Sequence, residues 1–509
     1  MKKITVAALI IVLITLPINA FASPPEFAGG VNNEYEYEEI VFITGKPVKF
    51  TGTAKITEKD KADSKTISYK INLTPIENSG KDKLTRSVTY VTEYDDHSDK
   101  GQTIGQTRVS SYSETIELDG NKFTLKDYQF SKSDVIDNRP ASDFYSGNVT
   151  GRKVYDINKR GRTSEGEVIV DISGGNAGYE NFWGATETQV IDFVYNVVWK
   201  LPDGNQTGDE DENEIIPYRS WQGTVGSQVS DSMTKKLKYS DNEAGLSSFD
   251  GGYICITNSE IVSKYNYDLP YTDEDGTDGR KREKGTVHLS KEMVPKVERL
   301  IVPKFRDLGG HWAESYISKL YSLDVFDEIS TFFVPDVPMT RGEFTRGIMR
   351  ACDIRPNQEP TKKTSGRNRE PEISPFTDVS AEDADYEYVK NAFEKEIIKG
   401  VSEGKFEPEA FLTRAQAITV IIRALGFENK APTPGYITSF SDDRLIPSWA
   451  KDSIYMAREI GLVQGDQLNR INPNDELTRA EASAMLVRFL EFLEKDLQQD
   501  YRENIILFN

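Results

Sequence analysis

Three arginines, each following a threonine at the start of an expected helix, are the residues of this chain best suited to bind an anion. They lie in the related segments Thr340-Arg341-Gly342-Glu343, Thr413-Arg414-Ala415-Gln416 and Thr478-Arg479-Ala480-Glu481. A residue at the first helical position lies beside unpaired backbone N–H groups and the positive end of the helix dipole. A guanidinium there can hold a carboxylate or a phosphate through two parallel hydrogen bonds. The alternative is a surface ion pair, which stabilises a protein only weakly, but the repetition in three segments favours a binding site.

An acidic loop in the first half of the chain has oxygen-bearing side chains at the spacing of a calcium loop. Its candidate ligands are Asp203, Asn205, Thr207, Asp209, Asp211 and Glu214. The twelve-residue calcium loop places oxygen ligands at positions 1, 3, 5, 7, 9 and 12 and glycine at position 6, here Gly208. Position 5 is a threonine and the flanking segments resemble strands, so a metal-free acidic hairpin loop is the alternative. We predict calcium at this loop with that alternative open.

The arginines belong to a longer repeat that would build the elements around them. In each segment the threonine and the Glu or Gln three residues later form a capping box at the start of an apolar helix. A Phe-x-Asp element lies 35 to 38 residues upstream of each threonine, ending at Asp307, Asp378 and Asp442. An earlier helix in each repeat should start near Trp312, Ala384 or Trp449. Repeats of this size are supersecondary units that share one core, so the helices should pack as a small bundle.

Residues 24–290 have the pattern of β-structure. Apolar and polar side chains alternate, as in the run from Ile191 to Trp199. Asp119-Gly120 between two such runs is the strongest hairpin signal in the chain. Because no strand–helix–strand rhythm is present, we expect an all-β, mostly antiparallel array, sandwich-like or closed on itself. Clustered glycines suggest a boundary near residues 150–165, with a single domain as the alternative.

Composition limits the classes of partner. The chain has 509 residues and a net charge of −20, which repels nucleic acid, so no nucleic-acid partner is expected. The two cysteines fall in different expected domains, which argues against a disulfide framework. The common motifs of zinc proteases, serine hydrolases and phosphate loops are missing from the sequence. This leans against an enzyme without deciding the question, because an active site need not carry a readable motif.

The first residues have the three parts of a secretory signal. Lys2 and Lys3 supply positive charge, an apolar run follows from Ile4 to Leu16, and Ala20-Phe21-Ala22 is a small-x-small cleavage site. We therefore predict a signal peptide at residues 1–22, with an uncleaved N-terminal anchor as the alternative. No later segment has the apolar length of a transmembrane anchor, which takes about 20 residues.

The three repeats resemble S-layer homology (SLH) domains over residues 304–495. The third repeat has the family pattern nearly complete, with Phe440-Ser441-Asp442, Trp449-Ala450, Gly461 to Gly465, Pro473 and Thr478-Arg479-Ala480-Glu481. The resemblance implies an all-α unit of three repeats with pseudo-threefold symmetry. Its repeats would occupy residues 304–354, 376–428 and 439–495, with a linker at 355–375 and a tail at 496–509.

By this resemblance, the unit would attach an exported protein non-covalently to a secondary cell-wall polysaccharide. Pyruvate-ketal groups of the polymer would bind in grooves between repeats, with their carboxylates on Arg341, Arg414 and Arg479. Trp312 and Trp449 would pack on sugars, Asp307, Asp378 and Asp442 would hydrogen-bond nearby, and Gly400 and Gly465 would form the turns. Ala384 replaces the second tryptophan and the first repeat lacks the turn glycines, so the third repeat is the safest source of binding residues.

These expectations combine into a secreted protein of the bacterial cell wall or S-layer. The repeats would anchor it, and the β-rich region would serve as a structural, S-layer or adhesion module, with self-assembly in a surface layer as a further expectation. The alternative is a wall-tethered enzyme acting on an extracellular polysaccharide. A carbohydrate-binding module is suggested only by aromatic residues such as Trp183 and Trp221, which are more often core residues.

Overall fold

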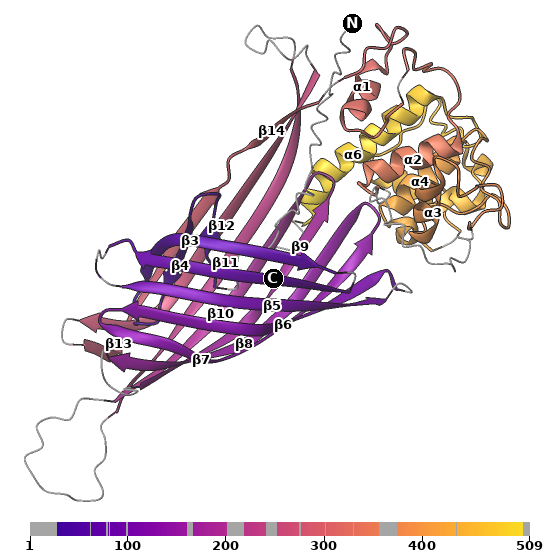
Figure 1. Cartoon of the computed structure of the whole chain (residues 1–509). Coiled ribbons are helices and arrows are strands. Elements are labelled where there is room, and N and C mark those ends of the chain that lie inside the picture. The colour runs from indigo at the N-terminus through magenta and orange to yellow at the C-terminus, as the bar shows by residue number, and fades with distance from the viewer. Residues whose placement is uncertain are drawn as a thin grey trace, which may run out of the picture.

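The structure has a strand-rich part followed along the chain by a helical part (Figure 1). The computed structural model describes residues 28–501, apart from positions 62, 78–79, 81, 98–99, 160–165, 201–217, 241–251, 274–275, 301, 329, 356–373 and 434. None of the helices formed by these residues has the length and apolar character needed to cross a membrane. The predicted signal peptide and the acidic loop at 203–214 both lie outside the described residues.

The strand-rich part is one antiparallel sheet in which consecutive strands are neighbours. The order runs from β1 to β13 without a crossover, and β14 pairs with β12 beside β13. β8 and β9, which flank the expected boundary near residues 150–165, pair with each other. The strands are β1 (Val31–Asn32), β2 (Tyr37–Val41), β3 (Val48–Asp60), β4 (Ser64–Pro75), β5 (Lys83–His97), β6 (Gln102–Leu118), β7 (Asn121–Arg139), β8 (Ser142–Lys159), β9 (Gly166–Asn181), β10 (Gly184–Lys200), β11 (Tyr218–Ser240), β12 (Gly252–Asp273), β13 (Gly276–Glu292) and β14 (Lys296–Leu300).

The hairpin predicted at Asp119-Gly120 is confirmed. β6 ends at Leu118 and β7 begins at Asn121, and these two residues are paired. Asp119 and Gly120 have φ angles of 52° and 76°, the left-handed values that a type I′ turn requires. The turn therefore sets the register of this hairpin, and with it which side chains face the core.

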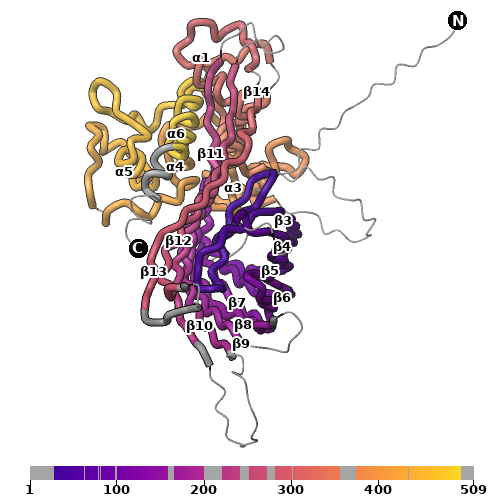
Figure 2. The backbone as a smooth tube through the Cα atoms, turned by 90° about the vertical axis from the view of Figure 1, so that its left-hand side faces the viewer, coloured from indigo at the N-terminus to yellow at the C-terminus, as the bar shows by residue number. Residues whose placement is uncertain are grey.

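The sheet curls until its two ends almost meet. In Figure 2 the strands run round from β3, through β7 to β10, to β11–β13 on the opposite side. At the seam, the Tyr265 hydroxyl of β12 donates to the Gly29 carbonyl at 2.5 Å. Lys291 of β13 pairs with Glu36 and, at 3.0 Å, with Glu38. The inward-facing apolar side chains of these strands form one continuous core, as the alternating pattern predicted.

A network of paired charges lies inside the sheet. Arg86 of β5 donates to Glu39 at 2.7 Å and to Glu114 at 3.0 Å, and Lys153 lies 3.0 Å from Glu114. Burial by itself would raise the pKa of Glu114, but the cations of Arg86 and Lys153 lower it to about 2. Two carboxylates and two cations balance each other, so these groups stay charged within the core.

A second polar cluster inside the sheet has a less balanced charge. Glu187 of β10 and Asp231 of β11 stand directly opposite each other, and both are buried. Asn176 and Gln189 donate hydrogen bonds to Glu187 at 3.1 and 3.0 Å, and Lys132 lies 3.8 Å from it. Burial, and then the charge of Glu187, raise the pKa of Asp231 to about 8. Asp231 is therefore largely protonated near neutral pH.

The helical part contains a pair of α-helices for each repeat. The expected capping boxes are present at all three second helices, where each threonine hydroxyl accepts from the N–H three residues later and that residue's side chain accepts in return. The first helices begin two residues after the positions predicted. The helices are α1 (Glu314–Ser322), α2 (Arg341–Ala351), α3 (Tyr386–Glu394), α4 (Arg414–Ala424), α5 (Lys451–Glu459) and α6 (Arg479–Tyr501), with short turns η2 (Glu428–Lys430), η3 (Asp443–Leu445) and η4 (Ser448–Ala450).

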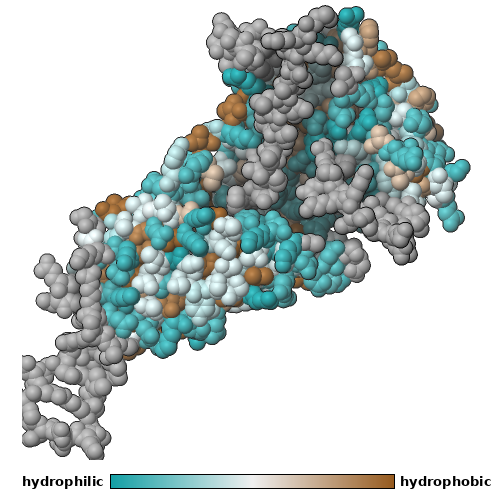
Figure 3. Space-filling view, in the orientation of Figure 1, coloured by the Kyte–Doolittle hydropathy of each residue, from teal (hydrophilic) through white to brown (hydrophobic). Residues whose placement is uncertain are grey.

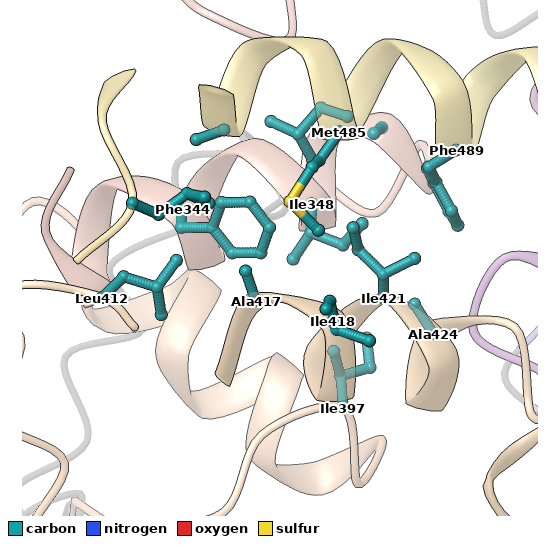
Figure 4. Close-up of a cluster of buried hydrophobic side chains, with 14 of the residues drawn as sticks. Phe344, Ile348, Ile397, Leu412, Ala417, Ile418, Ile421, Ala424, Met485 and Phe489 are labelled. Atoms are coloured by element: carbon teal, nitrogen blue, oxygen red, sulfur yellow. The ribbon is translucent and has the colours of Figure 1, made fainter. Parts of the chain in front are cut away.

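A closed cycle of backbone hydrogen bonds joins the three repeats just before the capping threonines. The N–H of Met339 donates to the carbonyl of Leu477 at 2.9 Å, Leu477 to Leu412 at 2.8 Å, and Leu412 back to Met339 at 2.9 Å. Around this cycle, α2, α4 and α6 bring their apolar faces together, as Figure 4 shows for Ile348, Ile421 and Met485. The predicted packing of three similar helices around one core is thus observed.

The helical part packs on one end of the sheet, at the turns between β7 and β8 and between β9 and β10. The indole N–H of Trp183 donates to the Leu490 carbonyl of α6 at 2.7 Å, and the N–H of Ala141 donates to Ala424 at 3.0 Å. Trp183 and Trp221 are only 4% and 7% exposed, so both are core residues. Elsewhere the outer face of the strands in Figure 3 is mostly hydrophilic, with scattered apolar residues.

Candidate functional site

The three aspartates of the Phe-x-Asp elements all pin a loop within their own repeat. Asp307 accepts from the N–H groups of Phe333 and Val334 at 3.0 and 2.7 Å. Asp378 binds Phe406 and Glu407 in the same way, and Asp442 binds Ile471 and Asn472. Desolvation acts against ionisation, yet the backbone donors hold the pKa of Asp307 and of Asp378 below the ordinary value. The geometry thus makes these carboxylates positioning groups for the groove loops.

Each candidate arginine lies at the boundary with the next repeat, because its backbone is bound there. The N–H of Arg341 donates to Ala410 of the second repeat at 3.0 Å, and that of Arg414 donates to Asp475 of the third at 3.0 Å. Arg479 closes the series by donating to Val337 of the first repeat at 2.9 Å. The structure therefore sets the three arginines between repeats, in equivalent places.

Arg341 lines a groove of about 360 Å³ that contains residues of all three repeats. Its Nε donates to the Phe406 carbonyl at 2.9 Å, and its guanidinium lies over the Phe406 ring at 4.9 Å from the centroid. Burial lowers the pKa of Arg341, although a guanidinium stays charged. Within the described part of the chain, no carboxylate lies at ion-pair distance from Arg341.

The groove around Arg341 is cationic. Lys399 and Arg423 also line it, and none of its described lining residues is an Asp or a Glu, although Glu428, outside the lining, pairs with Arg423 at 2.9 Å. Trp449 of the third repeat, 51% exposed, lines it too and offers an aromatic face. The groove thus combines positive charge with an exposed ring in a chain whose net charge is −20. Such a site suits an anionic, ring-bearing ligand.

Gly400 lines the same groove, and a side chain at this position would not fit. A Cβ there would lie 2.6 Å from the Lys405 carbonyl oxygen and 2.8 Å from that of Ser402. Gly465 has the equivalent place in the third repeat, where a Cβ would come within 2.8 Å of Asn469. Both glycines let the loop turn tightly at the edge of a groove.

The Arg414 and Arg479 sites differ from the Arg341 site in their acidic neighbours. Arg414 lies 3.7 Å from Glu481. Arg479 donates to Glu343 at 2.5 Å and to Glu328 at 2.8 Å. The positively charged end of Arg479 is therefore already matched by two carboxylates of the protein itself.

Trp312 lies on the surface of the first repeat, with its ring 57% exposed. His311 and Tyr316 flank it, with ring centroids at 5.6 and 6.3 Å. Trp312 and Trp449 are thus both available to solvent, as a sugar-packing role would require.

The acidic loop predicted to bind calcium cannot be placed in this site, because residues 203–214 lie outside the described residues. Among the residues that the structure describes, no group of three or more His, Cys, Asp or Glu side chains has the arrangement of a metal site.

Comparison with known protein families decides what the helical part is. A model of the S-layer homology domain matches residues 304–345, 375–418 and 439–483. The helical part holds three S-layer homology domains. The three matched segments contain Arg341, Arg414 and Arg479. Most residues of the groove around Arg341 also lie within them, and the rest follow the second segment directly.

Curated relatives include both surface proteins and glycosidases. The chain is 38% identical over 129 residues to a cell surface protein of Thermoanaerobacter kivui, covering 25% of this chain and 16% of that protein. It is 35% identical over 135 residues to an endoglucanase of Bacillus sp. (strain KSM-635), covering 26% and 14%. It is 29% identical over 119 residues to the surface-layer 125 kDa protein of Lysinibacillus sphaericus, covering 23% and 10%.

The chain therefore spans only a small share of the length of these relatives. Its SLH domains, together with the surface-layer relatives, indicate a secreted cell-surface protein.

Sequence reasoning missed the residues that distinguish the three sites, namely Glu328, Gln416, Lys399 and Arg423. The signal was present in the repeats themselves. Gln416 stands where the other two capping boxes have Glu343 and Glu481, so the neutral member marks the site without an acidic neighbour.

Proposed function

We propose that the SLH domains anchor the protein non-covalently to a secondary cell-wall polysaccharide through the groove at Arg341. Arg341 and Lys399 would receive an acidic substituent of the polymer, such as a pyruvate-ketal carboxylate, and Trp449 would pack on the sugar ring. The observation that carries the proposal is the absence of acidic side chains among the groove's described lining residues. A polymer carboxylate could pair directly with Arg341, which has no carboxylate at ion-pair distance among the described residues, although the charges of Glu407 and Asp378 act on it from further away.

We also propose that the three repeats form a pseudo-threefold unit. The closed cycle of hydrogen bonds through Met339, Leu412 and Leu477 supports this arrangement. So do the equivalent boundary positions of the three arginines. Equivalent grooves would follow from such symmetry, and differences in their side chains would then decide which of them bind.

The curled sheet would be the displayed part of the protein, serving as a structural, surface-layer or adhesion module. Its described charge clusters support this role, because Arg86 and its carboxylate partners are buried and paired with one another around an internal cavity of only about 50 Å³. The alternative is a wall-tethered enzyme that acts on an extracellular polysaccharide, and the relatives named as an endoglucanase and an exoglucanase support it. Calcium binding by residues 203–214 and export by a signal peptide at residues 1–22 also remain proposals.

The direct test is co-sedimentation of the purified protein with peptidoglycan sacculi that keep or lack their secondary polysaccharide. Wild type should sediment only with sacculi that keep the polymer. Arg341→Ala should weaken binding by about 10- to 100-fold, since a charge-assisted hydrogen-bonding pair contributes roughly 1.5–3 kcal/mol. Arg108→Ala is the matched control, because Arg108 is an exposed arginine on the sheet. Binding that ignores both the polymer and Arg341 would refute the proposal.

A further inference from the structure

The ion pair between Arg479 and Glu328 joins the third repeat to the first. Arg479 donates from Nη2 to Glu328 at 2.8 Å and from Nη1 to Glu343 at 2.5 Å, and its guanidinium lies over the Phe333 ring at 4.5 Å. Its side chain is only 13% exposed. The stacking matches that of Arg341 on Phe406, although the Nε of Arg341 donates to the Phe406 carbonyl and the buried Nε of Arg479 has no such bond to any described residue.

Glu328 occupies a position that is glycine in the other two repeats. In each repeat the first helix is followed by a residue with left-handed φ, at Asp324, Glu396 and Gly461. Four residues later the chain has Glu328, Gly400 and Gly465 respectively. The first repeat thus carries an acidic side chain where the second repeat has Gly400, a lining residue of the groove at Arg341.

Two further acids belong to the same site. Arg346 pairs with Glu328 at 3.0 Å and with Asp385 at 2.9 Å. Glu343 takes the place that Gln416 has in the groove at Arg341. The Arg479 site therefore contains Arg479 and Arg346 against Glu328, Glu343 and Asp385, a net negative set. By the same count, the Arg341 groove contains Arg341, Lys399 and Arg423 against Glu428, which pairs with Arg423 at 2.9 Å, a net positive set.

We propose that Glu328 is an internal carboxylate that occupies the anion position of the Arg479 site and keeps this site from binding ligand. The inference rests on the proposed function, since it assigns to this site the same acidic ligand that the Arg341 groove takes. The protein would then anchor through Arg341 while a second, related site stays closed by its own chain. Replacing Glu328 by glycine, as in the other two repeats, would free Nη2 of Arg479 for the ligand, while Glu343 keeps its bond to Nη1.

The test is a gain of binding in a variant that has lost it. Arg341→Ala removes the open groove, and Glu328→Gly is then added to the same chain. Co-sedimentation with polymer-bearing sacculi should recover to within about tenfold of wild type. A further Arg479→Ala change should abolish the recovered binding. Asp327→Gly in the Arg341→Ala background is the matched control, because Asp327 is the neighbouring acid and pairs with Arg350 at 2.6 Å instead.

The outcomes separate the two proposals. If wild type binds but the folded Arg341→Ala, Glu328→Gly variant does not, the inference about Glu328 is wrong and the proposed function stands. The same holds if Asp327→Gly restores binding as well as Glu328→Gly does. Wild type that ignores the polymer overturns the proposed function and this inference with it. If circular dichroism shows that Glu328→Gly is not folded, Glu328→Gln tests the same point, because it keeps the side-chain size and removes the charge. A partial recovery is then expected, and no recovery counts against the inference.

Discussion

Changing Asp231 to asparagine should make the protein more stable at pH 8 and should flatten its pH dependence. Asp231 is buried inside the sheet opposite Glu187, and its pKa is raised from 3.8 to about 8. Lys132 lies 3.8 Å from Glu187 and pairs more closely with Asp134, at 2.9 Å. Asparagine has nearly the same shape as the protonated carboxyl, so the substitution should keep the packing while removing the proton equilibrium.

The sign and size follow from proton linkage. Between pH 4 and 8 the folded state holds a proton on Asp231 that the unfolded state has released. Raising the pH therefore favours unfolding, by about 1.4 kcal/mol for each pH unit. Between pH 5 and 8 this amounts to roughly 4 kcal/mol in the free energy of unfolding, which is large against the stability of an ordinary domain.

The assay is urea denaturation followed by circular dichroism at pH 5, 6, 7 and 8, on wild type and Asp231→Asn side by side. The free-energy difference between the two proteins should grow in favour of the variant as the pH rises. Asp192→Asn, at an exposed carboxyl of the neighbouring strand β10, is the control, and its free energy of unfolding should run parallel to that of wild type. A constant difference between Asp231→Asn and wild type across this pH range would refute the reasoning.

Three other substitutions test separate parts of the structure. Trp183→Phe removes the indole N–H bond to Leu490 and should cost about 1–2 kcal/mol in thermal denaturation, whereas exposed Trp312→Phe should change stability by less than about 0.5 kcal/mol. Thr413→Ala removes a capping hydroxyl and should lower the free energy of unfolding by about 1 kcal/mol in urea denaturation; an unchanged value would show that the cap does not stabilise the helix. Arg86→Met leaves buried Glu39 and Glu114 without their shared cation and should cost about 3–5 kcal/mol at pH 7; a neutral result in urea denaturation would contradict the network's role.

Local features of the fold were predictable from sequence because short-range chemistry determines them. The turn at Asp119-Gly120 needs two residues with left-handed φ, and Asp and Gly both adopt such angles readily. The capping box at Thr340 depends only on a threonine and an acid three residues apart. Both features were predicted, and both are present.

Contacts between distant segments were not predictable in the same way. Alternation in β8 does not reveal that Lys153 faces inward, because its partner Glu114 lies 39 residues away on another strand. The pairing of Arg479 with Glu328 spans 151 residues and depends on which repeat follows which around the cycle. The sequence therefore favoured the third repeat as the binding site, whereas the geometry points to Arg341.

The closed cycle through Met339, Leu412 and Leu477 has a consequence for how this unit can evolve. Linear arrays of repeats grow or shrink by whole units, since each repeat contacts only its neighbours and the ends are capped. Here the first and third repeats bond directly to each other, so no repeat is an end. Deleting one repeat would remove two of the three junctions, and inserting one would open the cycle at a junction. The cycle therefore constrains the number of repeats to three. Variation is then expected in the connecting loops and in the side chains at the boundaries between repeats.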